Sequence, residues 1–142
     1  MKSGGYLVSS SSINGNEYNH PWLDYSSADY SCWSPSVNSA GQWIQVGSPD
    51  LREWLKVIIQ GRGDKDEWVT KFKISYTTNG ETFKYVENGR IFTGNDDRNT
   101  KVEIKFKKMI EARTIRIIPV EWNNGIALRF DAVAMSNALE MI

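Results

Sequence analysis

The stretch "WVTKFKISYTTNG", residues 68–80, decides the fold class, because its apolar residues recur at every second position. Phe72, Ile74 and Tyr76 would share one face of an extended strand, and the residues between them are polar. The strand runs into Asn79-Gly80, a dipeptide that favours a tight hairpin turn. The pattern predicts an amphipathic strand in an antiparallel sheet.

The chain after Gln42 repeats this short-period pattern. "EWLKVIIQG" is a largely apolar strand that ends at Gly61, and "KVEIKF" alternates apolar and charged residues. "TIRIIPV" and "IALRFDAVAM" are predicted as two further strands, separated by the turn-forming run "EWNNG". The first forty residues show little periodicity and are predicted to be loops packed onto the strands. We therefore predict an all-β protein, an antiparallel β-sandwich of jelly-roll type.

Composition limits the partners and the compartment. The 142 residues suit one domain, and the 17 basic and 17 acidic residues cancel, so nucleic acid is a disfavoured partner. Cys32 is alone, which excludes a disulfide within the chain. The start has no apolar core of a signal peptide, and no stretch is long enough to span a bilayer. We expect a cytoplasmic or non-classically secreted protein, with an extracellular or cell-surface function as the alternative.

Four segments carry a resemblance to a known family. "CWSPSVNSAGQWIQV", "VIIQGRGDKDEWVTKFKISYTTNG", "FTGND" and "EARTIRIIPVEWNNGIALRFDAVAM" follow one another as they do in the discoidin domain, also called the coagulation factor 5/8 type C domain. The middle segments are most similar to the amino-terminal domain of slime-mould discoidin lectins. The resemblance implies a single discoidin domain over residues 1–142, with its core at about 8–135, a galactose-binding-domain-like jelly roll, and binding rather than catalysis.

The resemblance also implies where a ligand binds. It places the ligand loops at residues 13–22, 33–43 and 60–68, with a fourth contribution from 92–100. Sugar hydroxyls call for amide, carboxylate and guanidinium groups, and the apolar face of a sugar calls for an aromatic ring. The loops offer these groups at nine candidate ligand-binding residues: Asn16, Glu17, His20, Trp22, Ser36, Asn38, Arg62, Asp64 and Trp68. Asn38 matches the position at which relatives place an Asp or Asn that faces the ligand.

Several of these residues also have an ordinary structural interpretation. Trp68 begins a strand and is expected to be half-buried, and His20, the single histidine, could simply hydrogen-bond locally. Trp33 and Trp43 match core positions of the family, as Trp122 does. Arg129 matches an arginine that is buried and hydrogen-bonded in relatives.

Catalysis and metal chemistry have little support in the sequence. The single His and single Cys give no nucleophile–base pair with a recognisable spacing, and zinc-ligand spacing is absent. "GNDDRN" and "GDKDE" contain enough carboxylates for a calcium ion, although neither follows the EF-hand pattern. We expect no enzymatic activity and no required cofactor, and a structural Ca²⁺ is the one candidate metal.

Three functions remain open. The first is a lectin-like domain for galactose- or N-acetylgalactosamine-type glycans in cell adhesion or glycan recognition, with glycans or glycoproteins as partners. The second is a protein- or peptide-binding adhesion module whose loops grip a partner peptide or a cell-surface receptor, with binding through Arg62-Gly63-Asp64 as one version. The third is an accessory domain that targets a larger enzyme to carbohydrate. Membrane insertion is disfavoured, because the tip of the first loop lacks an exposed pair of large apolar residues.

Overall fold

The computed structural model describes residues 6–14, 20–26 and 31–135, and this part of the chain is almost entirely strand and loop. Its elements follow in the order β1 (Leu7–Ser10), β2 (Ile44–Gln60), β3 (Trp68–Thr77), β4 (Lys84–Tyr85), the 3₁₀ turn η1 (Val86–Asn88), β5 (Phe92–Thr93), β6 (Val102–Asn123) and β7 (Arg129–Ala134). All strand pairings are antiparallel. The predicted all-β class is confirmed.

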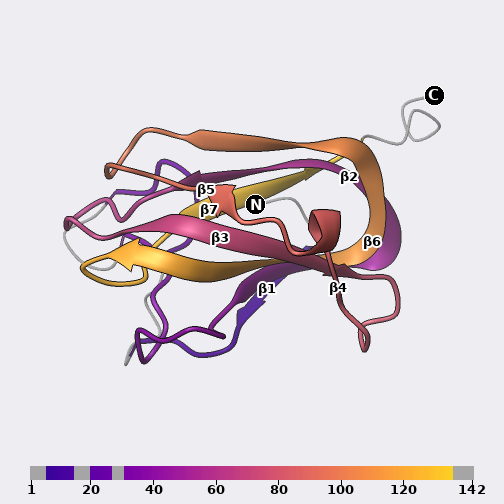
Figure 1. Cartoon of the computed structure of the whole chain (residues 1–142), viewed down its shortest axis with the longest axis horizontal. Helices are drawn as coiled ribbons and strands as arrows, with labels where there is room; N and C mark the ends of the chain where they lie inside the picture. The colour runs from indigo at the N-terminus through magenta and orange to yellow at the C-terminus, as the bar shows by residue number, and fades with distance from the viewer. Residues whose placement is uncertain (1–5, 15–19, 27–30, 136–142) are drawn as a thin grey trace.

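Two long strands, β2 and β6, bend and so contribute to both layers of the sandwich (Figure 1). Ile44–Gly47 pairs with the part of β6 around Ile115, and the later part of β2 pairs with residues 102–112. The register shifts between Gly47 and Arg52, where the strands turn from one layer into the other. The two strands predicted at "KVEIKF" and "TIRIIPV" are therefore one bent strand, because continued pairing with β2 carries the backbone around the corner without a turn.

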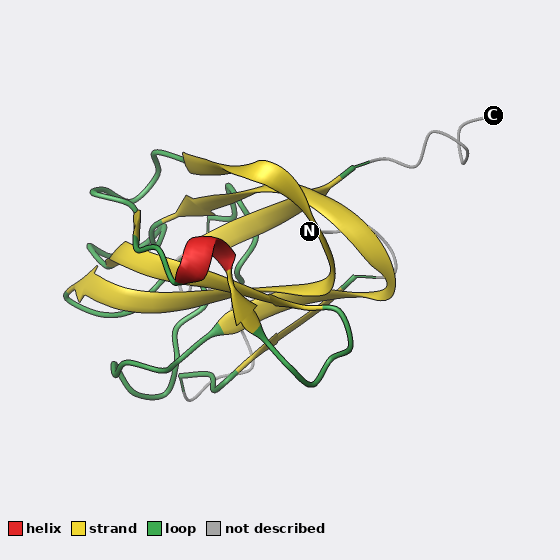
Figure 2. Cartoon of the chain, turned by 45° about the vertical axis from the view of Figure 1, so that its right-hand side comes forward, coloured by secondary structure: helices red, strands yellow, loops and turns green. Residues whose placement is uncertain are grey.

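Each layer combines half of each long strand with shorter strands. The first layer holds β1, the start of β2, the end of β6 and β3, with β4 and β5 on the far edge of β3. The second layer holds the start of β6, the end of β2 and β7. Figure 2 shows both long strands curving at one end of the sandwich, while most of the loops gather at the opposite end.

The hydrophobic core lies between the layers. Trp54, Phe72, Ile115 and Phe130 have no exposed surface there, and the indole N–H of Trp54 donates to the carbonyl of Ala112 at 2.9 Å. Phe72 and Ile74 face the core as the alternation predicts, because neighbouring residues of a strand point to opposite faces.

The described part of the first forty residues is mostly loop, as predicted, but Leu7–Ser10 forms the edge strand β1, which pairs with β2. Its burial alternates weakly, so the short run gives no clear strand signal in the sequence. Later in this region Trp33, 1% exposed, donates its indole N–H to the carbonyl of Ser12 and bridges Leu128. No helix within the described ranges is long and apolar enough to cross a membrane.

Candidate functional site

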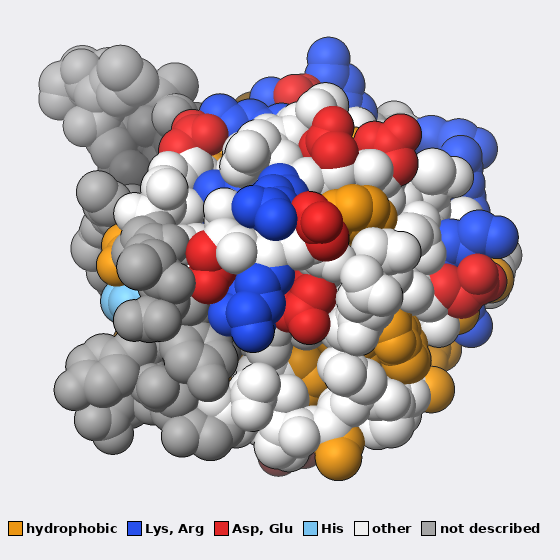
Figure 3. Space-filling view, turned by 90° about the vertical axis from the view of Figure 1, so that its left-hand side faces the viewer, with side chains coloured by type: hydrophobic (Ala, Val, Ile, Leu, Met, Phe, Trp, Pro, Cys, Tyr) orange, Lys and Arg blue, Asp and Glu red, His pale blue; other side chains and the backbone are white. Residues whose placement is uncertain are grey.

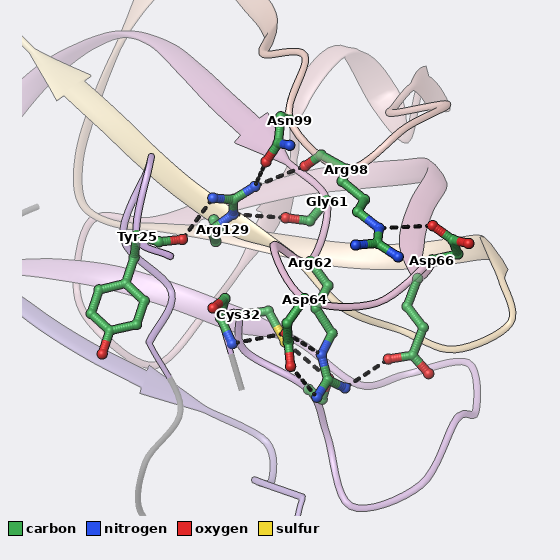
Figure 4. Close-up of polar contacts among 12 residues, drawn as sticks. Tyr25, Cys32, Gly61, Arg62, Asp64, Asp66, Arg98, Asn99 and Arg129 are labelled. Atoms are coloured by element: carbon green, nitrogen blue, oxygen red, sulfur yellow. Dashed lines mark hydrogen bonds and ion pairs between the residues drawn. The ribbon is translucent and has the colours of Figure 1, made fainter. Parts of the chain in front are cut away.

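Arg129, the first residue of β7, ties three loops together at one end of the sandwich. It is 1% exposed, and its guanidinium donates to the carbonyls of Gly61 at 2.8 Å, Tyr25 at 2.7 Å and Arg98 at 2.8 Å, and to Oδ1 of Asn99 at 2.8 Å (Figure 4). These bonds confirm the expected structural role of this arginine. Loops that are far apart in sequence are thereby held at fixed positions.

Arg62 organises the loop between β2 and β3 in a different way. Its Nε and Nη2 donate to the two oxygens of Asp64 at 2.8 and 3.2 Å, and its Nη1 donates to Oε1 of Glu67 at 2.8 Å (Figure 4). Asp64 also accepts the backbone N–H of Ser31 at 3.2 Å. Burial alone would raise the pKa of Asp64, but the hydrogen bonds from Arg62 and Ser31 outweigh it and hold the pKa below its ordinary value. The loop is therefore closed and rigidified by its own ion pairs.

A small polar cleft opens beside this ion-paired loop, with a volume of about 160 Å³. Its walls come from four loops that the fold brings together, and seven of the ten lining residues carry a polar side-chain group. The lining residues are Asn14, Ser34, Pro35, Ser36, Asn38, Arg62, Lys65, Glu67, Gly125 and Ile126. Over the same end of the molecule, acidic and basic side chains are intermingled (Figure 3).

Asn38 is held in a defined orientation in this cleft. Its Oδ1 accepts the backbone N–H of Ile126 at 2.9 Å, and its Nδ2 makes no hydrogen bond within the described part of the chain. Gly125 permits the close approach, because a Cβ there would lie 2.8 Å from Oε2 of Glu67 and 3.5 Å from Nδ2 of Asn38. The cleft thus presents a fixed amide donor next to a carboxylate oxygen that Arg62 does not occupy.

This set of groups suits a ligand with neighbouring hydroxyls. The amide of Asn38 can donate, Oε2 of Glu67 can accept, and Lys65 and Ser36 add a cation and a hydroxyl at the rim. No aromatic ring is among the lining residues that the structure describes, so stacking on a sugar face has no group here. The described residues of the cleft would therefore bind a ligand mainly through hydrogen bonds of fixed direction.

The structure brings together three of the predicted ligand residues, namely Ser36, Asn38 and Arg62. Asp64 does not line the cleft, and both of its oxygens accept hydrogen bonds from the guanidinium of Arg62. Trp68 lies outside it as well, with its Cβ packed close to Gly61.

The other predicted residues lie elsewhere. Trp22 forms a bridge with Phe130 and lines a separate, mainly apolar cavity of about 570 Å³ that also includes Trp33. His20 stacks on Tyr25 with ring centroids 4.1 Å apart, as a local packing contact. The predicted contacts at Asn16 and Glu17 fall outside the described residues.

Seven of the lining residues are not among the predicted ligand residues: Asn14, Ser34, Pro35, Lys65, Glu67, Gly125 and Ile126. Glu67 had a usable signal, because a carboxylate five residues after Arg62 in a short loop can reach its guanidinium. Gly125, in the turn-forming "NNG", was a second signal for a close approach. Asn14, Ser34, Pro35 and Lys65 lie within the predicted ligand loops, but which side chains of a loop face the cleft depends on the tertiary fold.

Among the described residues, the structure shows neither a cluster of metal ligands nor an activated nucleophile. No three His, Cys, Asp or Glu side chains cluster as a metal site among the residues described. In "GNDDRN", Asp97 already accepts bonds from the backbone N–H groups of Asn99 and Thr100 and from the Thr100 hydroxyl. Burial raises the pKa of the Cys32 thiol to about 11, so it stays protonated at neutral pH and is a poor nucleophile.

Comparison with known protein families gives a family with this fold. The sequence model of the F5/8 type C domain matches residues 3–131, so the chain belongs to the F5/8 type C, or discoidin, family. Discoidin-2 of Dictyostelium discoideum is 41% identical over 103 residues, which are 72% of this chain and 40% of that protein. Human retinoschisin is 32% identical over 105 residues, 70% of this chain and 46% of that protein. The chain thus spans less than half the length of these curated relatives.

Solved structures show the same relationship. The wild-type discoidin II structure from Dictyostelium discoideum superposes with a TM-score of 0.87 at 33% identity, over 93% of this chain and 55% of that one. A family 32 CBM from C. perfringens NanJ, solved in complex with galactose, superposes with a TM-score of 0.66 at 18% identity, over 89% of this chain and 94% of that one. At that identity the likeness concerns the fold alone.

Proposed function

We propose that the chain is a lectin-like carbohydrate-binding domain and that it holds galactose- or N-acetylgalactosamine-type glycans in the polar cleft. The observation that carries the proposal is the pair formed by Asn38 and Glu67. An amide donor that Ile126 fixes in place, and a carboxylate oxygen that accepts no hydrogen bond from a described residue, both lie close to Gly125 at the cleft. Vicinal hydroxyls of a sugar can accept from the first and donate to the second.

The comparisons support this proposal without extending it to a particular sugar. One structure of the same fold contains galactose, and the chain shares its family with the discoidins. The cleft volume of about 160 Å³ fits one sugar ring better than a long oligosaccharide. We therefore propose terminal sugars of glycans or glycoproteins as ligands, in adhesion or glycan recognition.

The alternative of a receptor ligand at Arg62-Gly63-Asp64 is weaker. A receptor would need both charged side chains to extend into solvent. Arg62 is only 5% exposed, and its guanidinium and the Asp64 carboxylate are bonded to each other. Presenting the tripeptide would break this ion pair, which costs free energy because the groups are largely buried.

Titration of isotope-labelled protein with methyl galactoside and N-acetylgalactosamine, followed by NMR, tests the proposal. We expect saturable shifts at Asn38 and Ile126, and about fivefold or more loss of affinity in Asn38→Ala, since one hydrogen bond is worth about 1 kcal/mol. Asn38→Asp is the sharper variant, because it keeps an acceptor for Ile126 and replaces the amide donor by a carboxylate oxygen close to Glu67. Ser39→Ala, an exposed neighbour outside the cleft, is the matched control.

The same titration in EDTA and in CaCl₂ tests the calcium hypothesis, and we expect equal affinities. Binding that is equal for wild type, Asn38→Asp and Ser39→Ala would place the sugar elsewhere. Folded protein that shows no saturable shift with either sugar, and none on a glycan array, would refute carbohydrate binding in the cleft.

A further inference from the structure

A second and larger groove lies where β6 bends, away from the polar cleft. Its volume is about 810 Å³. One wall is the segment from the β3–β4 turn to η1, residues 76–88, and the other is the part of β6 from Phe106 to Glu111. Volumes of this size are typical of sites that enclose a ligand or a short peptide segment.

The β6 wall is an irregular strand edge. Lys105 pairs with Lys56 and Ile110 pairs with Trp54, so residues 106–109 lie opposite Leu55 alone. Within the described ranges β6 has no strand on its other side here, because β3 pairs only with residues 114–123. Bulged segments leave backbone N–H and C=O groups outside the regular ladder, where they can pair with an extended chain.

Lysines outnumber carboxylates in the lining of the groove, three to two. Lys84 and Lys108 are exposed and form no ion pair with any described residue. The carboxylate of Glu87 is already shared between Arg90 at 3.2 Å and Lys107 at 3.3 Å. Glu111 is the remaining acidic group in the lining, so the groove has an excess of cationic groups available to a partner.

Exposed apolar side chains line the same groove. Tyr85 is 52% exposed and Met109 is 47% exposed, and both line the groove. Phe106 and Val86 lie deeper and pack against the core. Large exposed apolar groups that are rimmed by charge mark interaction surfaces in many proteins.

We propose that this groove docks an extended acidic segment of a partner protein. An apolar side chain of that segment sits between Tyr85 and Met109, and its carboxylates pair with Lys84 and Lys108. The concave shape favours a peptide over a bilayer, since a flat membrane surface cannot enter a hollow between two walls. This surface is separate from the sugar cleft, so the two proposals stand or fall independently.

Fluorescence anisotropy with a labelled acidic peptide, Glu-Asp-Leu-Phe-Asp-Glu, tests the docking surface. We expect saturable binding that weakens as NaCl rises from about 50 to about 300 mM, because rim charges are screened. The double variant Lys84→Glu/Lys108→Glu should bind about tenfold more weakly or worse, because charge complementarity becomes repulsion. Lys71→Glu reverses one lysine on β3 outside the groove, which is half of the charge change in the double variant, and should bind like wild type.

Further probes separate the origins of binding. The amide analogue Gln-Asn-Leu-Phe-Asn-Gln should bind weakly, and Met109→Ala should lower affinity for the acidic peptide without altering the charge. Galactose at saturation should leave peptide affinity unchanged. Equal affinity of wild type and the double variant, or sedimentation with phosphatidylserine vesicles without peptide binding, would overturn the proposal.

Discussion

Two buried arginines near one end of the sandwich do different work. Arg129 bonds mainly to backbone carbonyls and fixes where three loops lie relative to the strands. Arg62 bonds to two carboxylates of its own loop and sets the shape of one cleft wall. One arginine therefore positions the loops, and the other shapes the surface that a ligand meets.

Arg129→Met should destabilise the protein by about 3 kcal/mol or more. The substitution leaves three backbone carbonyls and the Asn99 side chain without their donor, and each buried unsatisfied group costs about 1–3 kcal/mol. Urea unfolding followed by tryptophan fluorescence measures the change. Arg113→Met, at an exposed position of β6, is the control and should shift the free energy of unfolding by less than about 0.5 kcal/mol. Equal urea midpoints for the two variants would contradict the role assigned to Arg129.

The candidate residues show where sequence reasoning ends. Asn38 and Arg62 were predicted and line the cleft, because the resemblance fixes which loops converge. Trp68 and Asp64 were predicted and do not line it. The direction of a side chain at a loop end depends on its tertiary partner, and for Asp64 that partner is an arginine two residues away. Residue type and loop membership therefore predicted which loops form the site, but not which of their side chains line the cleft.

At the scale of elements, the small strand β5 is positioned by a close backbone contact with β3. The N–H groups of Gly94 and Asn95 donate to the carbonyls of Thr70 at 2.7 Å and Val69 at 2.8 Å. A Cβ on Gly94 would clash with the Val69 carbonyl oxygen, which is backbone and cannot rotate away. In the loop that follows β5, the carbonyl of Arg98 accepts a hydrogen bond from Arg129. The contact between β5 and β3 therefore also helps to position the loops at the end of the sandwich that holds the polar cleft.

Gly94→Ala should destabilise the protein by about 2 kcal/mol or more, because overpacking against fixed backbone usually costs 1–3 kcal/mol. Thermal unfolding measures the loss, and amide hydrogen exchange should show faster exchange at residues 94–100 than in β2. Thr93→Ala, the exposed neighbour in β5, should cost less than about 1 kcal/mol. If Gly94→Ala were as stable as Thr93→Ala, the backbone around Val69 would have to move to accept the methyl group without lowering the free energy of unfolding.

The bend in β2 and β6 shows which part of the fold the sequence could not predict. Alternation correctly predicted the strand character of "KVEIKF" and "TIRIIPV", since local pattern reports which face is buried. It could not show that one hydrogen-bonded strand joins them, because the corner depends on pairing with β2. The bulge at residues 106–109 is a second, separate irregularity in the same pairing, and it forms a wall of the second groove.

At the scale of the whole molecule, the described carboxylates favour the folded state at neutral pH. Hydrogen bonds lower the pKa values of five of them: Asp24 through Lys101, Asp97 through Thr100, Glu103 through Lys56, and, against the opposing effect of burial, Asp64 through Arg62 and Glu87 through Arg90. A group with a lowered folded-state pKa contributes stability above its unfolded pKa, about 3.9 for Asp and 4.3 for Glu. That stability is lost as the pH falls through the lower folded-state values.

The melting temperature should therefore be nearly constant from about pH 7 to about pH 5 and fall steeply from about pH 4 downward. Asp64→Asn isolates one contribution, because an amide cannot form the ion pair with Arg62 at any pH. The variant should be clearly less stable than wild type at neutral pH, and the difference should narrow as acid protonates Asp64 in the wild-type protein. Scanning calorimetry across this pH range measures both curves. Parallel curves, with a constant difference down to about pH 2, would mean that the Arg62–Asp64 pair adds no pH-dependent stability, and the rigidity of the cleft wall would then need another cause.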